Sequence, residues 1–274
     1  MHLDDLLDSQ LALPSIPRVI ALVLAELHRV EPDLRKISND INTDPGLAAR
    51  LLRLANSAQF QLTNKIGTVA EALAVLGLDQ VRSLTAAAGM AVAFRKVPGM
   101  DMHQFWRYSL DVAKLSRKLA HQARANASTA FTAGLVHAAG ELVMHLGMPD
   151  QMRWLNEQAP PLSGRRAGAE YHLLGYCYAD VGAGFAKSWQ FPNTIVEAIR
   201  YQIIPFDDGV YEPLAGIVNL AAWRARAREE GMSEGALADT FPDEIALTLG
   251  IDIDEVLMRE AVEWTTGQEA STLA

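Results

Sequence analysis

Three polar side chains recur at helical spacing in one apolar stretch, Phe131–Gly147, which reads FTAGLVHAAGELVMHLG. They are His137, Glu141 and His145, at positions i, i+4 and i+8. In a single helix, His137 and Glu141 would share a face, and such a pair binds metal in H-E-x-x-H proteins when a third ligand comes from elsewhere. Alternatively, His137 is a core residue whose ring nitrogens meet backbone or tyrosine groups, with Glu141 and His145 at the helix surface. We expect the second arrangement.

Other residues offer weaker candidates for chemistry. Cys177 has His172 nearby in the chain, but five residues away in a turn-rich region, so we expect a small core residue rather than a reactive thiol. Neither Ser163–Gly164 nor the pair Gly182 and Gly184 follows the strand that nucleophile and phosphate-binding motifs require. We expect the two glycines to let helices pack closely.

The composition limits the classes of function. The 274 residues carry a net charge of −9, which disfavours nucleic acid and anionic membranes as partners, although Arg50, Arg53 and Arg82 could form a local basic face. The single cysteine excludes an intramolecular disulfide and a multi-cysteine zinc site. An acidic N-terminus and the lack of 18 consecutive apolar residues predict neither a signal peptide nor a membrane span. We therefore expect a cytoplasmic protein.

Abundant Ala and Leu, with apolar residues at helical period, predict an all-α protein. The strongest start signals are Asp44 followed by Pro45 and the capping box formed by Thr68 and Glu71, while Gly77 predicts a stop. Ser128 is the expected cap of the helix around His137. Helices are expected over residues 16–30, 34–42, 46–60, 69–76, 80–94, 105–123, 131–146, 151–158, 169–174, 181–189, 193–201, 214–230, 243–249 and 253–264.

Several segments, in this order, resemble the HDOD family, the HD-related output domains of bacterial signalling proteins. They include LPSIP at 13–17, INTDPGLAARLLRLANSAQF at 41–60, IGTVAEALAVLGLDQVRSL at 66–84 and FTAGLVHAAGEL at 131–142. The resemblance implies an N-terminal helical bundle (1–97) packed on a degenerate core similar to HD phosphohydrolases (98–225), followed by a helical extension (226–274). The residues that carry the motif are Asp44, Pro45, Arg50, Asn56, Ser57, Gly77, Arg82, Trp106, Gly134, Gly182, Trp189 and Pro192.

The resemblance also implies where HD enzymes keep their metal ligands. The upstream His falls at Tyr108, the His-Asp pair at His137 and Ala138, and the late Asp at Ala222. Two further histidine positions fall at Tyr178 and at Tyr201 or Gln202. Because only His137 remains, we expect no metal, no cofactor and no phosphohydrolase activity. The residual pocket comprises Tyr108, His137, Ala138, Glu141, Tyr178, Tyr201, Gln202 and Ala222.

The three tyrosines leave two possibilities for this pocket, because their hydroxyl groups need partners. It is either a filled, dry core or a cavity that binds a small ligand such as a nucleotide. The leading expectation is a non-catalytic adaptor that binds a response regulator, a histidine kinase or a GGDEF protein of a two-component or cyclic-di-GMP pathway. The region after residue 225 is a candidate partner surface. Ligand sensing is the alternative, and a metal-dependent phosphohydrolase or direct DNA binding is disfavoured.

Overall fold

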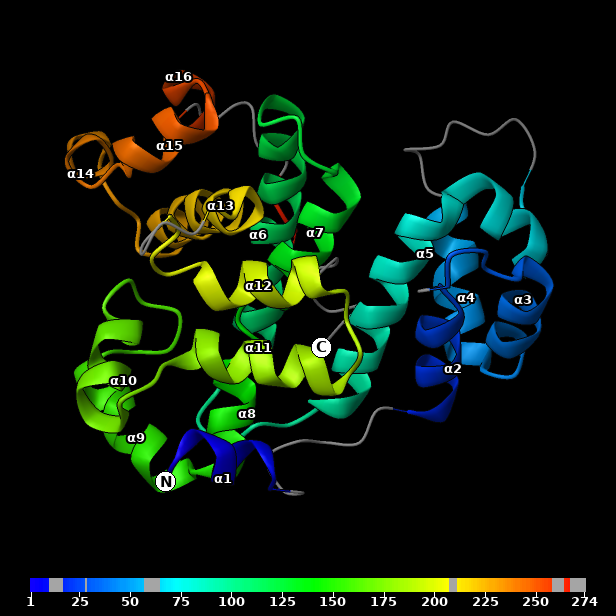
Figure 1. Ribbon diagram of the computed structural model, residues 1–274, viewed down its shortest axis with the longest axis horizontal. Helices are drawn as coiled ribbons and strands as arrows, with labels where there is room; N and C mark the ends of the chain where they lie inside the picture. Colours follow the sequence, from blue (N-terminus) through cyan, green and yellow to red (C-terminus); the bar gives the residue numbers. More distant parts are fainter. Residues whose placement is uncertain (10–16, 28, 57–64, 207–210, 258–263, 267–274) are drawn as a thin grey trace. The chain divides into compact units, whose positions relative to one another are not determined.

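The computed structural model describes residues 1–9, 17–27, 29–56, 65–206, 211–257 and 264–266 (Figure 1). Every regular element in these ranges is a helix, so the predicted all-α class is confirmed. No helix among them has both the length and the hydropathy that crossing a bilayer requires. The chain forms two compact units, one of Ser15–Ala93 and one of Met1–Pro14 with Phe94–Ala274.

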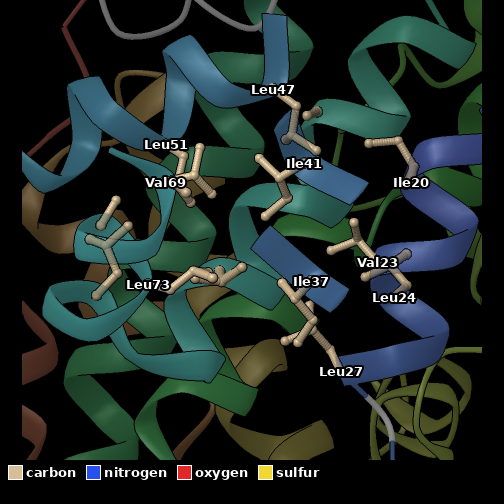
Figure 2. Close-up of a cluster of buried hydrophobic side chains, with 14 of the residues drawn as sticks. Ile20, Val23, Leu24, Leu27, Ile37, Ile41, Leu47, Leu51, Val69 and Leu73 are labelled. Carbon is tan, nitrogen blue, oxygen red and sulfur yellow. The ribbon is translucent and has the colours of Figure 1, made fainter. Parts of the chain in front are cut away.

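The described residues of the smaller unit form four helices around an aliphatic core. The helices are α2 (Arg18–Leu27), α3 (Leu34–Asn42), α4 (Pro45–Ala55) and α5 (Val69–Ala93). Figure 2 shows side chains from all four meeting in one cluster, in which Val23, Ile37, Ile41 and Leu51 have no exposed surface. Burial of such side chains stabilises the fold by about 1.5–3 kcal/mol each.

The predicted caps of this unit are confirmed. Oδ1 of Asp44 accepts hydrogen bonds from the amides of Gly46 and Leu47 at 2.9 and 3.0 Å, and Pro45 is the first residue of α4. Thr68 and Glu71 form the reciprocal capping box, with bonds of 3.1 and 3.2 Å. Local sequence therefore sets where α4 and α5 begin.

Gly77 interrupts the long helix α5, as the sequence predicts. Its φ of +74° lies outside the helical region, and the helix resumes directly after it. Only glycine adopts this conformation without strain, so the interruption of α5 requires a glycine at this position.

The larger unit contains the candidate site. α11 (Tyr178–Ser188) packs against α8 (Ala139–Gly147) and α12 (Asn193–Tyr201). α13 (Pro213–Glu229) packs against α12, α7 (Ala127–Val136) and α6 (Met102–Gln122) (Figure 1). The remaining helices of this unit are α1 (Leu3–Leu7), α9 (Pro149–Gln158), α10 (Arg166–Leu174), α14 (Glu234–Asp239), α15 (Asp243–Leu249) and α16 (Ile253–Leu257).

The structure corrects the prediction of one helix over 131–146. α7 ends at Val136 and α8 begins at Ala139, with His137 and Ala138 in a turn between them. His137 and Glu141 therefore do not share the face of one helix. The cap of α7 is Asn126, whose Oδ1 accepts from two backbone amides, and not Ser128. The short helices α1 and α14 were not predicted.

Glycines allow the backbones of α8 and α11 to touch. A Cβ atom on Gly140 would lie 1.9 Å from the carbonyl oxygen of Tyr178, and one on Gly182 would lie 3.3 Å from the amide of Gly140. A Cβ on Gly184 would meet Leu7 of α1 at 2.4 Å. The expectation that Gly182 and Gly184 permit close helix packing is confirmed.

Parts of the expected elements lie outside the described residues. These are residues 13–16 and Ser57 of the family motifs, residues 16 and 28 of the helix expected over 16–30, residues 57–60 and 258–263 at the ends of expected helices, and the tail from residue 267.

Candidate functional site

His137 is fully buried at the turn between α7 and α8, with both ring nitrogens engaged. Nδ1 lies 2.6 Å from the carbonyl oxygen of Gly134, which can only accept, so Nδ1 carries the proton. Nε2 then accepts from the hydroxyl of Tyr108, 3.3 Å away. Burial lowers the pKa of His137 to about 3, so the ring is neutral at physiological pH.

Arg226 of α13 brings a positive charge into the same core. Its Nη2 donates to the hydroxyl of Tyr178 at 3.0 Å, and its Nε is enclosed without a hydrogen-bond partner among the described residues. The charge of Arg226 acts on Tyr108, His137 and Glu141 and favours the neutral form of the imidazole. Sequence reasoning missed this residue. Its signal was its position one helical turn after Ala222, which places both on one face of α13.

The other residues of the predicted pocket contribute little that could bind a metal. Ala138 and Ala222 are buried methyl groups. Gln202 donates from Nε2 to the backbone carbonyl of His137 at 2.8 Å, so it supports the turn. Tyr201, the other residue proposed for that position, is partly exposed.

The expectation that Glu141 and His145 lie at the surface is wrong, because both are about 1% exposed. They face Arg166 of α10, a fully buried arginine that the sequence did not identify. Nε of Arg166 lies 3.2 Å from Oε1 of Glu141 and 2.7 Å from Oε1 of Glu170. Nδ1 of His145 donates to the carbonyl of Pro98 at 2.8 Å, which leaves Nε2 to face Arg166.

This buried ion cluster shifts the titration of its members. Burial first, and then the charge of Glu141, raises the pKa of Glu170 to about 9. Burial also raises the pKa of Glu141 and lowers that of His145 to about 4. Glu170 additionally accepts from the amide of Tyr178 at 2.7 Å, so the cluster ties α8, α10 and the start of α11 together.

These residues do not fit a metal ion. Among the described residues, no group of three His, Cys, Asp or Glu side chains is arranged to hold one. His137 uses both nitrogens, and the carboxylate of Glu141 is paired with Arg166. A second cation beside Arg226 would also be repelled in this enclosed core.

Cys177 occupies a structural position. The thiol is fully buried and accepts from the amide of Ala179 at 3.4 Å, at the start of α11. Burial raises the pKa of Cys177 to about 12, so the reactive thiolate is disfavoured. The expected core role is confirmed.

Several residues of the motif hold the backbone in place. Asn56, at the end of α4, bonds both the amide and the carbonyl of Ile66, at 2.8 and 2.9 Å. Arg82 donates to the carbonyl of Leu27 at 2.7 Å. A Cβ atom on Gly134 would lie 2.7 Å from Oγ of Ser116. Two other motif residues, Trp106 and Trp189, are buried and pack on Phe105 and Phe185 respectively. Pro192 directly precedes α12. The Nη1 atom of Arg50 is buried.

Comparison with known families agrees with this architecture. The HDOD domain matches residues 13–205, which is more than half of the chain. The chain belongs to the HDOD family. This confirms the resemblance drawn from the motifs, and residues 206–274 of this HDOD protein lie beyond the match.

Solved structures share the fold. A Shewanella amazonensis protein provisionally named a phosphohydrolase is 30% identical, with a TM-score of 0.80 over 99% of this chain and 98% of its own. A Marinobacter aquaeolei protein provisionally named for signal transduction is 23% identical, with a TM-score of 0.72 over 100% of this chain and 60% of its own. At that identity the second likeness shows the fold alone.

A curated relative is an uncharacterized protein of Treponema pallidum, 23% identical over 212 residues. The match covers 76% of this chain but 41% of that protein, so this HDOD protein spans less than half of its relative's length.

Proposed function

We propose that this HDOD protein is a non-catalytic signalling adaptor that acts by binding other proteins. The observation that carries the proposal is the guanidinium of Arg226 beside His137, Tyr108 and Tyr178. Three of these positions are those that the family resemblance assigns to metal ligands. A fixed side-chain cation there supports a structural core rather than a site that exchanges metal and substrate.

The partners we propose are a response regulator, a histidine kinase or a GGDEF protein of a two-component or cyclic-di-GMP pathway. The HDOD family itself and the name of the Marinobacter relative support a signalling role. The net charge of −9 supports a protein partner over nucleic acid.

The absence of catalysis is tested with purified protein and its His137→Ala variant. Both are loaded with Mn²⁺ or Mg²⁺, analysed for bound metal and assayed with bis-p-nitrophenyl phosphate. We expect substoichiometric metal and no hydrolysis above the buffer rate. Stoichiometric metal with hydrolysis that His137→Ala abolishes would overturn the proposal.

The adaptor role is tested by affinity capture from the native cytoplasm, followed by titration of the purified partner in a calorimeter. We expect a regulatory protein that binds directly and saturably without added nucleotide. If binding depends wholly on an added nucleotide, the adaptor reading fails in favour of ligand sensing.

Small-ligand sensing is the second candidate, and one observation favours it. Nε of Arg226 is a buried donor without a hydrogen-bond partner among the described residues, near the hydroxyls of Tyr108 and Tyr178, and such donors suit phosphate oxygens. A ligand that binds only the folded state raises the melting temperature. A nucleotide panel that includes cyclic dinucleotides, applied to the wild type and to Arg226→Met, tests this candidate. No shift in the wild type excludes the tested nucleotides.

A further inference from the structure

The described residues at the C-terminal side, Trp264–Thr266, lie against the core helices of the larger unit. The indole of Trp264 is covered by two guanidinium groups from α13, with Arg224 5.2 Å and Arg228 4.7 Å from the ring centroid. The two arginines are four residues apart, so they project from one face of the helix. Guanidinium groups over an indole face attract it through the quadrupole of the ring.

The backbone of this segment is held by a buried carboxylate. The amide of Thr265 donates to Oδ1 of Asp111 at 2.6 Å, and Nη1 of Arg228 donates to Oδ2 at 2.5 Å. Asp111 lies in the middle of α6 and is 1% exposed. A buried carboxylate with an unpaired oxygen is costly, and among the described residues the bond to Oδ1 of Asp111 comes from the amide of Thr265.

Arg224 connects the same face to α16. Its Nε donates to the carbonyl of Val256 at 3.1 Å, near the end of that helix. The face of α6 and α13 thus combines a main-chain hydrogen bond with a place for one aromatic side chain. Extended peptides are recognised in the same way, with main-chain bonds for affinity and a side-chain site for specificity.

On α6 and α13, the residues that hold this segment lie close in the sequence to residues that face the buried core around His137. Asp111 follows Tyr108 by three residues on α6, and Arg226 stands between Arg224 and Arg228 on α13. Attachment of the segment therefore acts on the two helices that position Tyr108 and Arg226.

We propose that Trp264 and Thr265 form a releasable strap, an intramolecular peptide ligand of the face made by Asp111, Arg224 and Arg228. The occupant is the chain's own Trp264 and Thr265, which hold this face closed until they are displaced. The inference goes beyond the adaptor proposal, since the strap can exist whether or not the core binds a partner. Because the segment is part of the same chain, its effective concentration at this face is of the order of millimolar. A separate peptide of the same sequence, added at a lower concentration, is therefore excluded from the face.

The test uses the full-length chain and a fluorescein-labelled peptide with the sequence of residues 260–269, EAVEWTTGQE. Binding is followed by fluorescence polarisation for the wild type, Trp264→Ala, and Trp264→Ala combined with Arg228→Gln or with Asp111→Asn. Trp154→Ala is the matched control, because Trp154 is an exposed tryptophan on α9. Melting temperatures confirm that each variant is folded, and Arg228→Gln keeps the test valid if the Asp111 variant fails to fold.

We expect Trp264→Ala to bind the peptide about tenfold or more tighter than the wild type, because its own segment competes less well. The added Arg228 or Asp111 substitution should reverse that gain by a similar factor. Trp154→Ala should behave as the wild type. Equal binding by wild type and Trp264→Ala, no binding by Trp264→Ala, or binding unaffected by the second substitution would each overturn the strap.

Discussion

The guanidinium of Arg226 donates a hydrogen bond to the hydroxyl of Tyr178, 3.0 Å away, in the core that also contains His137. The two residues come from α13 and α11, and neither pairs with a carboxylate through a described hydrogen bond. The positive charge is therefore stabilised by the neutral oxygens of Tyr178 and Tyr108 and by the charge of Glu230, and it also acts on Glu141. The buried charges of the larger unit therefore lead to testable predictions about the stability of the protein.

Arg226→Met should destabilise the protein by about 2–3 kcal/mol, because it removes a hydrogen bond to a charged group and leaves the buried hydroxyl of Tyr178 unpaired. Urea unfolding at neutral pH measures the change. Arg153→Met is the control, since Arg153 is an exposed arginine on α9 and should matter by less than about 0.5 kcal/mol. Equal stability of the two variants would show that Arg226 is not an anchor of the core.

Arg166→Met should be more damaging, at about 3–5 kcal/mol, because it removes the buried guanidinium that binds the carboxyl groups of both Glu141 and Glu170. The neighbouring Arg165 is exposed, so Arg165→Met is a control that differs by one position in the chain. Thermal and urea unfolding of the pair give the comparison. A loss no larger than that of Arg165→Met would contradict the proposed burial of the ion cluster.

The buried histidines predict a loss of stability in mild acid. The folded-state pKa of about 3 for His137 and about 4 for His145 lies below the ordinary value of 6.5, so the unfolded chain takes up protons first. The stabilisation is present above pH 6.5 and is lost as the pH falls towards these values, by about 1.4 kcal/mol per pH unit for each histidine.

The measurement is the unfolding free energy between pH 6 and pH 4.5 for the wild type, His137→Gln and His145→Gln. In each variant the unfolding free energy should change less steeply with pH than in the wild type, by about 1.4 kcal/mol per pH unit. This difference in slope does not depend on the absolute stability of the variant. His172→Gln changes an exposed histidine and is the matched control. Identical slopes for all four proteins would mean that the two rings are not held neutral.

Asn56→Ala should cost about 1–2 kcal/mol in the smaller unit, because both bonds to the backbone of Ile66 are lost. Arg53→Ala, an exposed change on the same helix, is the comparison. Hydrogen exchange at the amide of Ile66 reports the loss directly, and unchanged protection of that amide would contradict the role assigned to Asn56.

The sequence predicts those features of the fold that depend on neighbours along the chain. Asp44, the pair Thr68 and Glu71, and Gly77 act within a few residues of themselves, and the helix boundaries they predict are found. The break at His137 could not be predicted in this way, because neither His137 nor Ala138 is a helix-breaking residue and the nearby glycines lie inside the two helices.

The site was predicted less completely for a related reason. His137 with its tyrosine partner followed from the family motif and the demand of buried rings for hydrogen bonds. Arg166, Glu170 and Arg226 were missed, because a charged residue on a helix is ordinarily solvated, and only partners far along the chain make its burial tolerable. Glu141 was misplaced at the surface because its cation, Arg166, lies on a different helix.

The contact of Gly140 with the backbone of α11 bears on how natural or engineered variation should be interpreted. A saturation library would tolerate only glycine at position 140, whereas an added Cβ on Gly164 or Gly168 meets nothing within 4 Å and should be accepted. Gly140 is three residues from His137, so a map of mutational tolerance would show a strict requirement for glycine close to the core histidine. The requirement comes from the close packing of α8 and α11. It would therefore be found even in a protein without catalytic activity, and it is not evidence of an active site.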